Sequence, residues 1–143
     1  MGFKFLNDIS ISDIAFEADS GTLEGLFKSA ADALVNSMIR NYKDIKQVKT
    51  VEFTLRESNL ESLFVAFLEK LIFYKDVEGL VFNGFKLVIK ETDGEWVVSC
   101  KAKGEKLNAK KHELIVDVKA VTMHLLEVEK KGNGWHAQAV LDI

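Results

Sequence analysis

The sequence predicts an α+β fold in which two helices pack on one face of a mixed, largely antiparallel sheet. Two stretches repeat apolar residues at the three- and four-residue spacing of amphipathic helices, whereas most of the second half alternates apolar and polar residues. The pairs Asp93-Gly94 and Asn133-Gly134 are typical of tight hairpin turns. We therefore expect a single domain over 1–143, with the order strand, helix, strand, helix and then several antiparallel strands.

The two helices are predicted from their apolar spacing and their first residues. Thr22 is the expected N-cap of a helix that ends near Asn41. Ser58 and Glu61 form an expected capping box at the start of the second helix. The apolar positions are Leu23, Leu26, Phe27, Ala30, Leu34 and Met38 in the first helix, and Leu60, Leu63, Phe64, Phe67, Leu68, Leu71 and Ile72 in the second.

Strands are expected where β-branched residues gather or where the apolar period is two. Cys100 shares the apolar face of one such segment, so we expect it to be a small buried hydrophobe. The expected strands cover 9–18, 51–55, 85–89, 96–102, 114–122 and 135–143.

Composition excludes several classes of protein. The 143 residues are 48% hydrophobic, which is enough for one core, and the absence of proline excludes Pro-rich linkers. A single cysteine excludes an intramolecular disulfide framework and a multi-thiolate zinc site. The net charge of −3 and only two arginines, Arg40 and Arg56, argue against direct nucleic-acid binding. No long apolar run resembles a signal peptide or a membrane span, so we expect a cytoplasmic protein without membrane contact.

Enzyme motifs are missing from the sequence. It contains no phosphate-binding loop, no Gly-x-Ser-x-Gly elbow and no His-Glu-x-x-His helix. His112, His124 and His136 are scattered over the last third of the chain, and we expect solvated or hydrogen-bonded rings there. The sequence therefore predicts no catalytic residues.

Two aspartates are unusual for their positions. Asp13 lies in a strand-like run with apolar flanks, and burial of an unpartnered carboxylate costs several kcal/mol. Its partner could be a lysine, a hydrogen-bonded cap at the strand end, or a metal ion. Asp142 lies next to Ile143 at the end of a predicted strand, where its carboxylate and the terminal carboxylate concentrate negative charge. Such oxygen ligands select hard cations such as Ca²⁺ or Mg²⁺.

Several short stretches are spread over nearly the whole chain. They are Asp13-Ile14, Thr22-Leu23-Glu24-Gly25-Leu26-Phe27, Asn59-Leu60-Glu61-Ser62-Leu63, Leu71-Ile72-Phe73-Tyr74, Ala102-Lys103-Gly104-Glu105, Val118-Lys119-Ala120-Val121-Thr122-Met123-His124 and Trp135 to Leu141-Asp142-Ile143. Together these stretches resemble the archease family. The family's Lys-Ala-Val-Thr-Tyr-His is similar to Lys-Ala-Val-Thr-Met-His here, and its terminal Phe-Asp-Ile is similar to the ending Leu-Asp-Ile.

The sequence departs from the family pattern in two places. Ser10-Ile11-Ser12 stands where archeases usually carry His-Thr-Ala, and Met123 stands where the family often has tyrosine. Asp8 could also match the family's first aspartate, but only with a five-residue insertion before Thr22. Asp13 needs no gap and is therefore the preferred match.

The resemblance implies an accessory protein that is not itself an enzyme. Archeases promote the guanylylation and repeated turnover of a GTP-dependent tRNA-splicing RNA ligase. The family's divalent-metal site maps onto Asp13, Asp142 and Ile143, with Ca²⁺ expected and Mg²⁺ or Mn²⁺ as alternatives. Lys119 and His124 are expected to contact the partner ligase, and RNA is expected to be reached only through that ligase.

Two other functions compete with this hypothesis. One is a general protein chaperone or interaction module with an incidental metal site. The other is a metal-dependent phosphoesterase that uses Asp13 and Asp142 for the cation and His124 as base, but no further acids or histidines cluster near either aspartate in the sequence.

Overall fold

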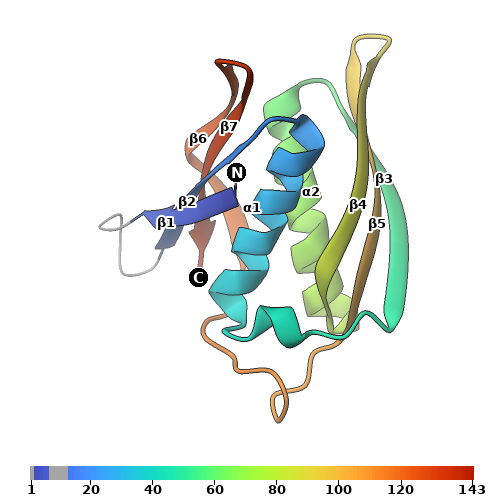
Figure 1. Cartoon of the computed structure of the whole chain (residues 1–143), viewed down its shortest axis with the longest axis vertical. Coiled ribbons are helices and arrows are strands. Elements are labelled where there is room, and N and C mark those ends of the chain that lie inside the picture. Colours follow the sequence, from blue (N-terminus) through green and yellow to red (C-terminus); the bar gives the residue numbers. More distant parts are fainter. Residues whose placement is uncertain (1, 7–12) are drawn as a thin grey trace.

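The computed structural model describes residues 2–6 and 13–143 (Figure 1). The alternative metal ligand Asp8, the first four residues of the expected strand 9–18 and the departure at Ser10-Ile11-Ser12 lie outside the described residues. In chain order the elements are β1 (Gly2–Leu6), β2 (Asp13–Ser20), α1 (Leu23–Met38), the 3-10 turn η1 (Tyr42–Asp44), β3 (Lys49–Glu57), α2 (Leu60–Phe73), the π-helical turn η2 (Tyr74–Glu78), β4 (Leu80–Thr92), β5 (Glu95–Lys106), β6 (Ala120–Lys131) and β7 (Gly134–Asp142).

The described strands form two antiparallel sheets with the helices between them (Figure 1). The four-stranded sheet has the order β1-β2-β7-β6, and the three-stranded sheet has the order β3-β5-β4. The predicted α+β class, with two helices packed against antiparallel strands, is confirmed. The structure adds that the strands are divided between two sheets, each of which packs one face against the helices.

Both helices are apolar over a wide face because they are covered from two sides. Phe27 of α1 meets Phe64 of α2 edge to face, with 5.3 Å between ring centroids. Phe27 and Phe64 are fully buried, as is Phe67, which also packs on Phe27. Cys100 is only 4% exposed at the edge of this core, which confirms its prediction as a small hydrophobe.

The helix limits differ from the expected ones for local reasons. Thr22 caps α1 as predicted, accepting the amide of Gly25 at 3.0 Å. The helix ends at Met38 rather than near Asn41, because Ile39 turns to an extended conformation and pairs with Leu114.

The predicted capping box at the start of α2 is wrong. The N-cap is Asn59, whose Oδ1 accepts the amide of Ser62 at 2.8 Å. Ser58 therefore precedes the cap. Asparagine is as effective a cap as serine, so composition alone could not choose between the two neighbours.

The strand predictions need three corrections. The short edge strand β1 was not expected, and the last hairpin turns at Gly132-Asn133, one residue before the predicted pair. The run 114–122 becomes regular strand only from Ala120, because residues 107–119 cross from one sheet to the other. The turn at Asp93-Gly94 is confirmed, and both residues have positive φ, as a tight hairpin turn requires.

No helix in the described part of the chain is long and apolar enough to cross a membrane.

Candidate metal centre

Asp13 and Asp142 lie directly opposite each other in the four-stranded sheet. Asp13 begins β2, Asp142 ends β7, and the two are register partners in this antiparallel pair. Residues opposite each other share a face of the sheet, with Cβ atoms about 4.5–5.5 Å apart. The two carboxylates that the sequence singled out are therefore neighbours on the outer face.

The carboxylates of this pair repel each other unless a positive charge intervenes. Both residues are half-buried, and like charges directly opposite across strands are destabilising. Within the residues that the structure describes, neither carboxylate forms an ion pair with lysine, arginine or histidine. An unneutralised pair of oxygen donors fits a hard cation such as Ca²⁺.

Side chains of the described residues do not complete a metal site by themselves. Nowhere in residues 2–6 and 13–143 do three or more His, Cys, Asp or Glu side chains gather so that they could hold a metal ion. A cation at Asp13 and Asp142 would therefore need further donors. The oxygens of Ile143, the residue after Asp142, are nearest in the chain.

The strand end that carries Asp142 and Ile143 is held by the neighbouring strand. Asp142 pairs with Ala120 of β6, and the backbone amide of Lys119 donates to the Asp142 carbonyl at 2.8 Å. Ile143 packs against the edge of the core. Lys119 thus fixes this end through its backbone, while its side chain remains exposed.

His124 lies in an irregular segment of β6. Pairing with β7 shifts between Thr122 and Glu127, so the residues between them bulge from the edge of the sheet. Leu125 adopts a positive φ of 56°, an uncommon conformation for a non-glycine residue, and its carbonyl accepts a hydrogen bond from the side-chain Nε2 of Gln138. The bulge exposes His124 between Leu125 and Met123, which are 45% and 65% exposed.

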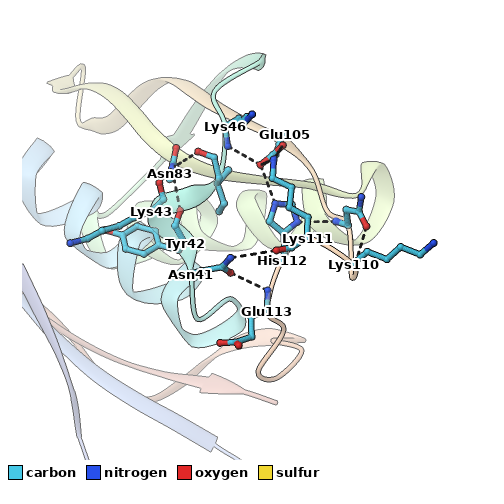
Figure 2. Close-up of polar contacts among 12 residues, drawn as sticks. Asn41, Tyr42, Lys43, Lys46, Asn83, Glu105, Lys110, Lys111, His112 and Glu113 are labelled. Atoms are coloured by element: carbon cyan, nitrogen blue, oxygen red, sulfur yellow. Dashed lines mark hydrogen bonds and ion pairs between the residues drawn. The ribbon is translucent and has the colours of Figure 1, made fainter.

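The first half of the connection 107–119 is anchored by a buried carboxylate, Glu105 (Figure 2). Glu105 accepts hydrogen bonds from the Lys46 amide at 2.7 Å and from the Lys111 ammonium at 2.6 and 2.8 Å. Mainly because of its hydrogen bond with Lys111, the pKa of Glu105 falls to about 2. Glu105 is therefore ionised and anchored at neutral pH.

His112 completes this network as a neutral ring. Its Nδ1 accepts the Asn108 amide at 2.9 Å, so Nε2 carries the proton and donates to Glu105 at 3.1 Å. The ring is only 2% exposed. This confirms the expectation of a hydrogen-bonded ring at this position.

The second half of the connection is anchored by Lys75, in the π-helical turn η2. Its ammonium donates to Asp117, to the Val118 carbonyl at 2.8 Å and to Asp76 at 2.8 Å. Burial lowers the pKa of Lys75, but the two carboxylates outweigh this and leave it raised. Because Val118 precedes Lys119, this buried cation supports the residue that holds the carbonyl of Asp142.

His136 is also satisfied by its neighbours. Its Nδ1 lies 2.7 Å from Asp19 Oδ1, and its Nε2 lies 3.9 Å from Glu17. Lys4 of β1 pairs with the same Glu17 at 2.9 Å. His136 thus joins a cluster of polar contacts along the strands that carry Asp13 and Asp142.

Sequence reasoning missed the anchoring residues. Glu105 lies within one of the quoted stretches, Ala102-Lys103-Gly104-Glu105, but nothing in that stretch indicated that its carboxylate would be buried. Lys75 continues the polar pattern at the end of a helix, where lysine is usually solvated. Only the folded contacts reveal either role.

Comparison with known proteins agrees with this architecture. The model of the archease protein family matches residues 3–143. "Protein archease" of Pyrococcus abyssi is 40% identical over 134 residues, covering 92% of this chain and 93% of the relative. "Protein archease" of Aeropyrum pernix is 31% identical over 140 residues, covering 97% and 96%. The solution structure of Methanobacterium thermoautotrophicum protein 1598 superposes with a TM-score of 0.86 at 29% identity, covering 99% of each chain. The chain belongs to the archease family.

Proposed function

We propose that this chain is a metal-binding accessory protein that activates a GTP-dependent tRNA-splicing RNA ligase. In this role it promotes guanylylation of the ligase and its return to activity after each turnover, without catalysing ligation itself. The observation that carries the proposal is the opposition of Asp13 and Asp142, two carboxylates without a described counter-ion on one sheet face. The archease relatives support the same assignment.

Asp13, Asp142 and the oxygens of Ile143 are the proposed ligands of a divalent cation, with Ca²⁺ favoured over Mg²⁺ and Mn²⁺. Three protein donors leave room in a Ca²⁺ sphere of about six to eight ligands. The remaining positions could take water, a nucleotide phosphate or a ligase carboxylate. The cation would thereby link this chain to the ligase during guanylylation.

The bulge of β6 is the proposed contact surface for the ligase. His124 is exposed there between two apolar side chains, Met123 and Leu125. The exposed side chain of Lys119 precedes the same strand, next to the residue that pairs with Asp142. A partner seated on this bulge would therefore lie beside the proposed cation.

The decisive experiment is a guanylylation assay with a purified partner ligase. We expect wild-type protein to stimulate ligase guanylylation, whereas Asp13→Asn and Asp142→Asn abolish stimulation and keep the fold. A matched control is Asp44→Asn, an exposed aspartate in η1. Full stimulation by both site variants would refute the metal-dependent role.

A general chaperone function makes a different prediction in the same experiment. Such a protein would suppress aggregation of unrelated proteins, and the Asp13→Asn variant would retain this effect. Hydrolysis of phosphoesters by the isolated protein would instead support an enzyme.

The contribution of Ile143 can be tested separately. Extension of the chain beyond Ile143 by a bulky tag should weaken calcium binding, whereas the same tag before Gly2 should not. An unchanged calcium titration with the tag after Ile143 would exclude this residue as a ligand.

A further inference from the structure

The two sheets present opposite charges on their outer faces. On the four-stranded sheet, the strand register places six carboxylates on the outer face, with few cations among them. They are Asp13, Glu17, Asp19, Glu127, Glu129 and Asp142. The helices separate this sheet from the three-stranded one, so the two outer faces lie on opposite sides of the molecule (Figure 1).

The outer face of the three-stranded sheet is basic. Register partners share a face, and Lys86, Lys101 and Glu52 form one outward row across β4, β5 and β3. Lys90 and Arg56 belong to a second outward row, and Lys103 belongs to a third. We call this surface the lysine face; its cations are Arg56, Lys86, Lys90, Lys101 and Lys103.

The lysine face has a net positive charge even when its own acidic side chains are included. Lys101 lies 3.5 Å from Glu52, and Arg56 lies 3.4 Å from Glu95, both as exposed pairs of little energetic value. In the described part of the chain, the ammonium groups of Lys86, Lys90 and Lys103 form no ion pair. Five of the 19 Lys and Arg residues but only two of the 22 acids therefore lie here.

We propose that the lysine face binds the phosphate backbone of RNA. Outward residues two apart on a strand are about 6.8 Å apart, so the lysines form a grid of point charges over an extended surface. A hollow of about 490 Å³ on this face is lined by Lys86, Lys101, Thr54 and Ser99, and also by Glu52, the carboxylate that pairs with Lys101. Lysine and the serine and threonine hydroxyls are common phosphate contacts. The choice of RNA rests on the proposed function, whereas the charge argument does not.

The chemistry of the lysine face favours a nucleic acid over an acidic protein. Protein interfaces are depleted in lysine and enriched in aromatic residues and arginine, whereas this face has four lysines, one arginine and no aromatic side chain. The missing aromatics also remove base stacking, so binding depends on phosphate charge and not on sequence. The opposite, acidic face would repel RNA, which orients the chain.

A fluorescence anisotropy titration with a labelled 12-nucleotide single-stranded RNA tests this proposal. For the three unpaired lysines, log K should fall with log salt with a slope of about −2, from about 0.7 per phosphate. The double variant Lys86→Gln/Lys103→Gln should weaken binding at least about tenfold at low salt and reduce the slope by about 1.4. The matched control is Lys43→Gln/Lys110→Gln, two exposed lysines outside the strands, one in η1 and one in the connection 107–119.

Three outcomes would overturn the proposal. They are no RNA binding at 25 mM KCl, an equal loss of RNA affinity in the control variant, and equal competition by polyglutamate, which would indicate an acidic protein partner.

The proposed function is tested independently by guanylylation without RNA. There, Lys86→Gln/Lys103→Gln should stimulate like wild type, while Asp142→Asn should lose stimulation but keep RNA affinity within about twofold. Failure of either activity therefore leaves the other measurable.

Discussion

Glu105 and His112 form a buried pair in which the histidine Nε2–H donates to the carboxylate at 3.1 Å. The six residues between them begin the connection that leaves the three-stranded sheet and ends at Lys119, beside the proposed metal centre. The pair thus anchors the start of this connection.

Glu105 should make the protein acid-sensitive. The folded-state pKa of Glu105 is lowered to about 2. Its contribution to the free energy of unfolding is therefore fully present above the ordinary carboxyl pKa of 4.5 and is lost as the pH falls from about 5 to about 2. Glu105→Gln should cost about 2 kcal/mol of unfolding free energy at pH 7, and the difference from wild type should vanish near pH 2. Urea unfolding at several pH values measures both effects.

A control for this experiment is Glu113→Gln, which removes the exposed ion pair with Arg40. It should change stability by less than about 1 kcal/mol at any pH. An equal loss in both variants would show that Glu105 has no special role.

Lys75 should keep residues 107–119 ordered. Lys75→Met leaves the Val118 carbonyl without its donor and should cost about 2 kcal/mol. Amide hydrogen exchange across 107–119 should become faster than in wild type, while exchange in β4 and β5 changes little. Unchanged exchange in the connection would contradict the anchoring role. Arg40→Met, which breaks only an exposed pair, is the matched control.

Removal of one carboxylate from the candidate metal centre should have opposite effects with and without metal. Without divalent cations, Asp13→Asn relieves the repulsion from Asp142 and should stabilise the protein by up to about 1 kcal/mol. With calcium in excess, the wild type should gain stability by ligand linkage, whereas the variant should not. Thermal unfolding in EDTA and in calcium measures the stability of both proteins without and with metal. An equal stabilisation of wild type and variant by calcium would argue against the site.

Cys100 should be chemically inert in the folded protein. Burial raises the pKa of its thiol to about 12, so almost no thiolate exists at pH 8. A disulfide reagent should react more than about 100-fold more slowly with folded protein than with urea-unfolded protein. Fast labelling under native conditions would show that β5 opens readily from the core.

Elements whose signals act over a few residues were predictable from the amino-acid pattern. Apolar spacing defined α1 and α2, Thr22 defined a cap, and Asp93-Gly94 defined a hairpin turn, because caps and turns satisfy groups within one turn of backbone. The predicted cap at Ser58 was wrong because the neighbouring Asn59 can also cap, and the backbone conformation decides which of the two does so. Asp13 and Asp142 were also singled out by their unusual positions alone.

Contacts between residues distant in the chain follow from the folded arrangement and not from local patterns. The register of β2 with β7 places Asp13 opposite Asp142, and the register of β4 with β5 places Lys86 beside Lys101. Strand pairing depends on which faces the whole chain can bury, and a shift of one residue would move every side chain to the other face. The net charge of −3 therefore concealed an acidic sheet face and a basic one, which become separate surfaces only when the helices fill the space between the sheets.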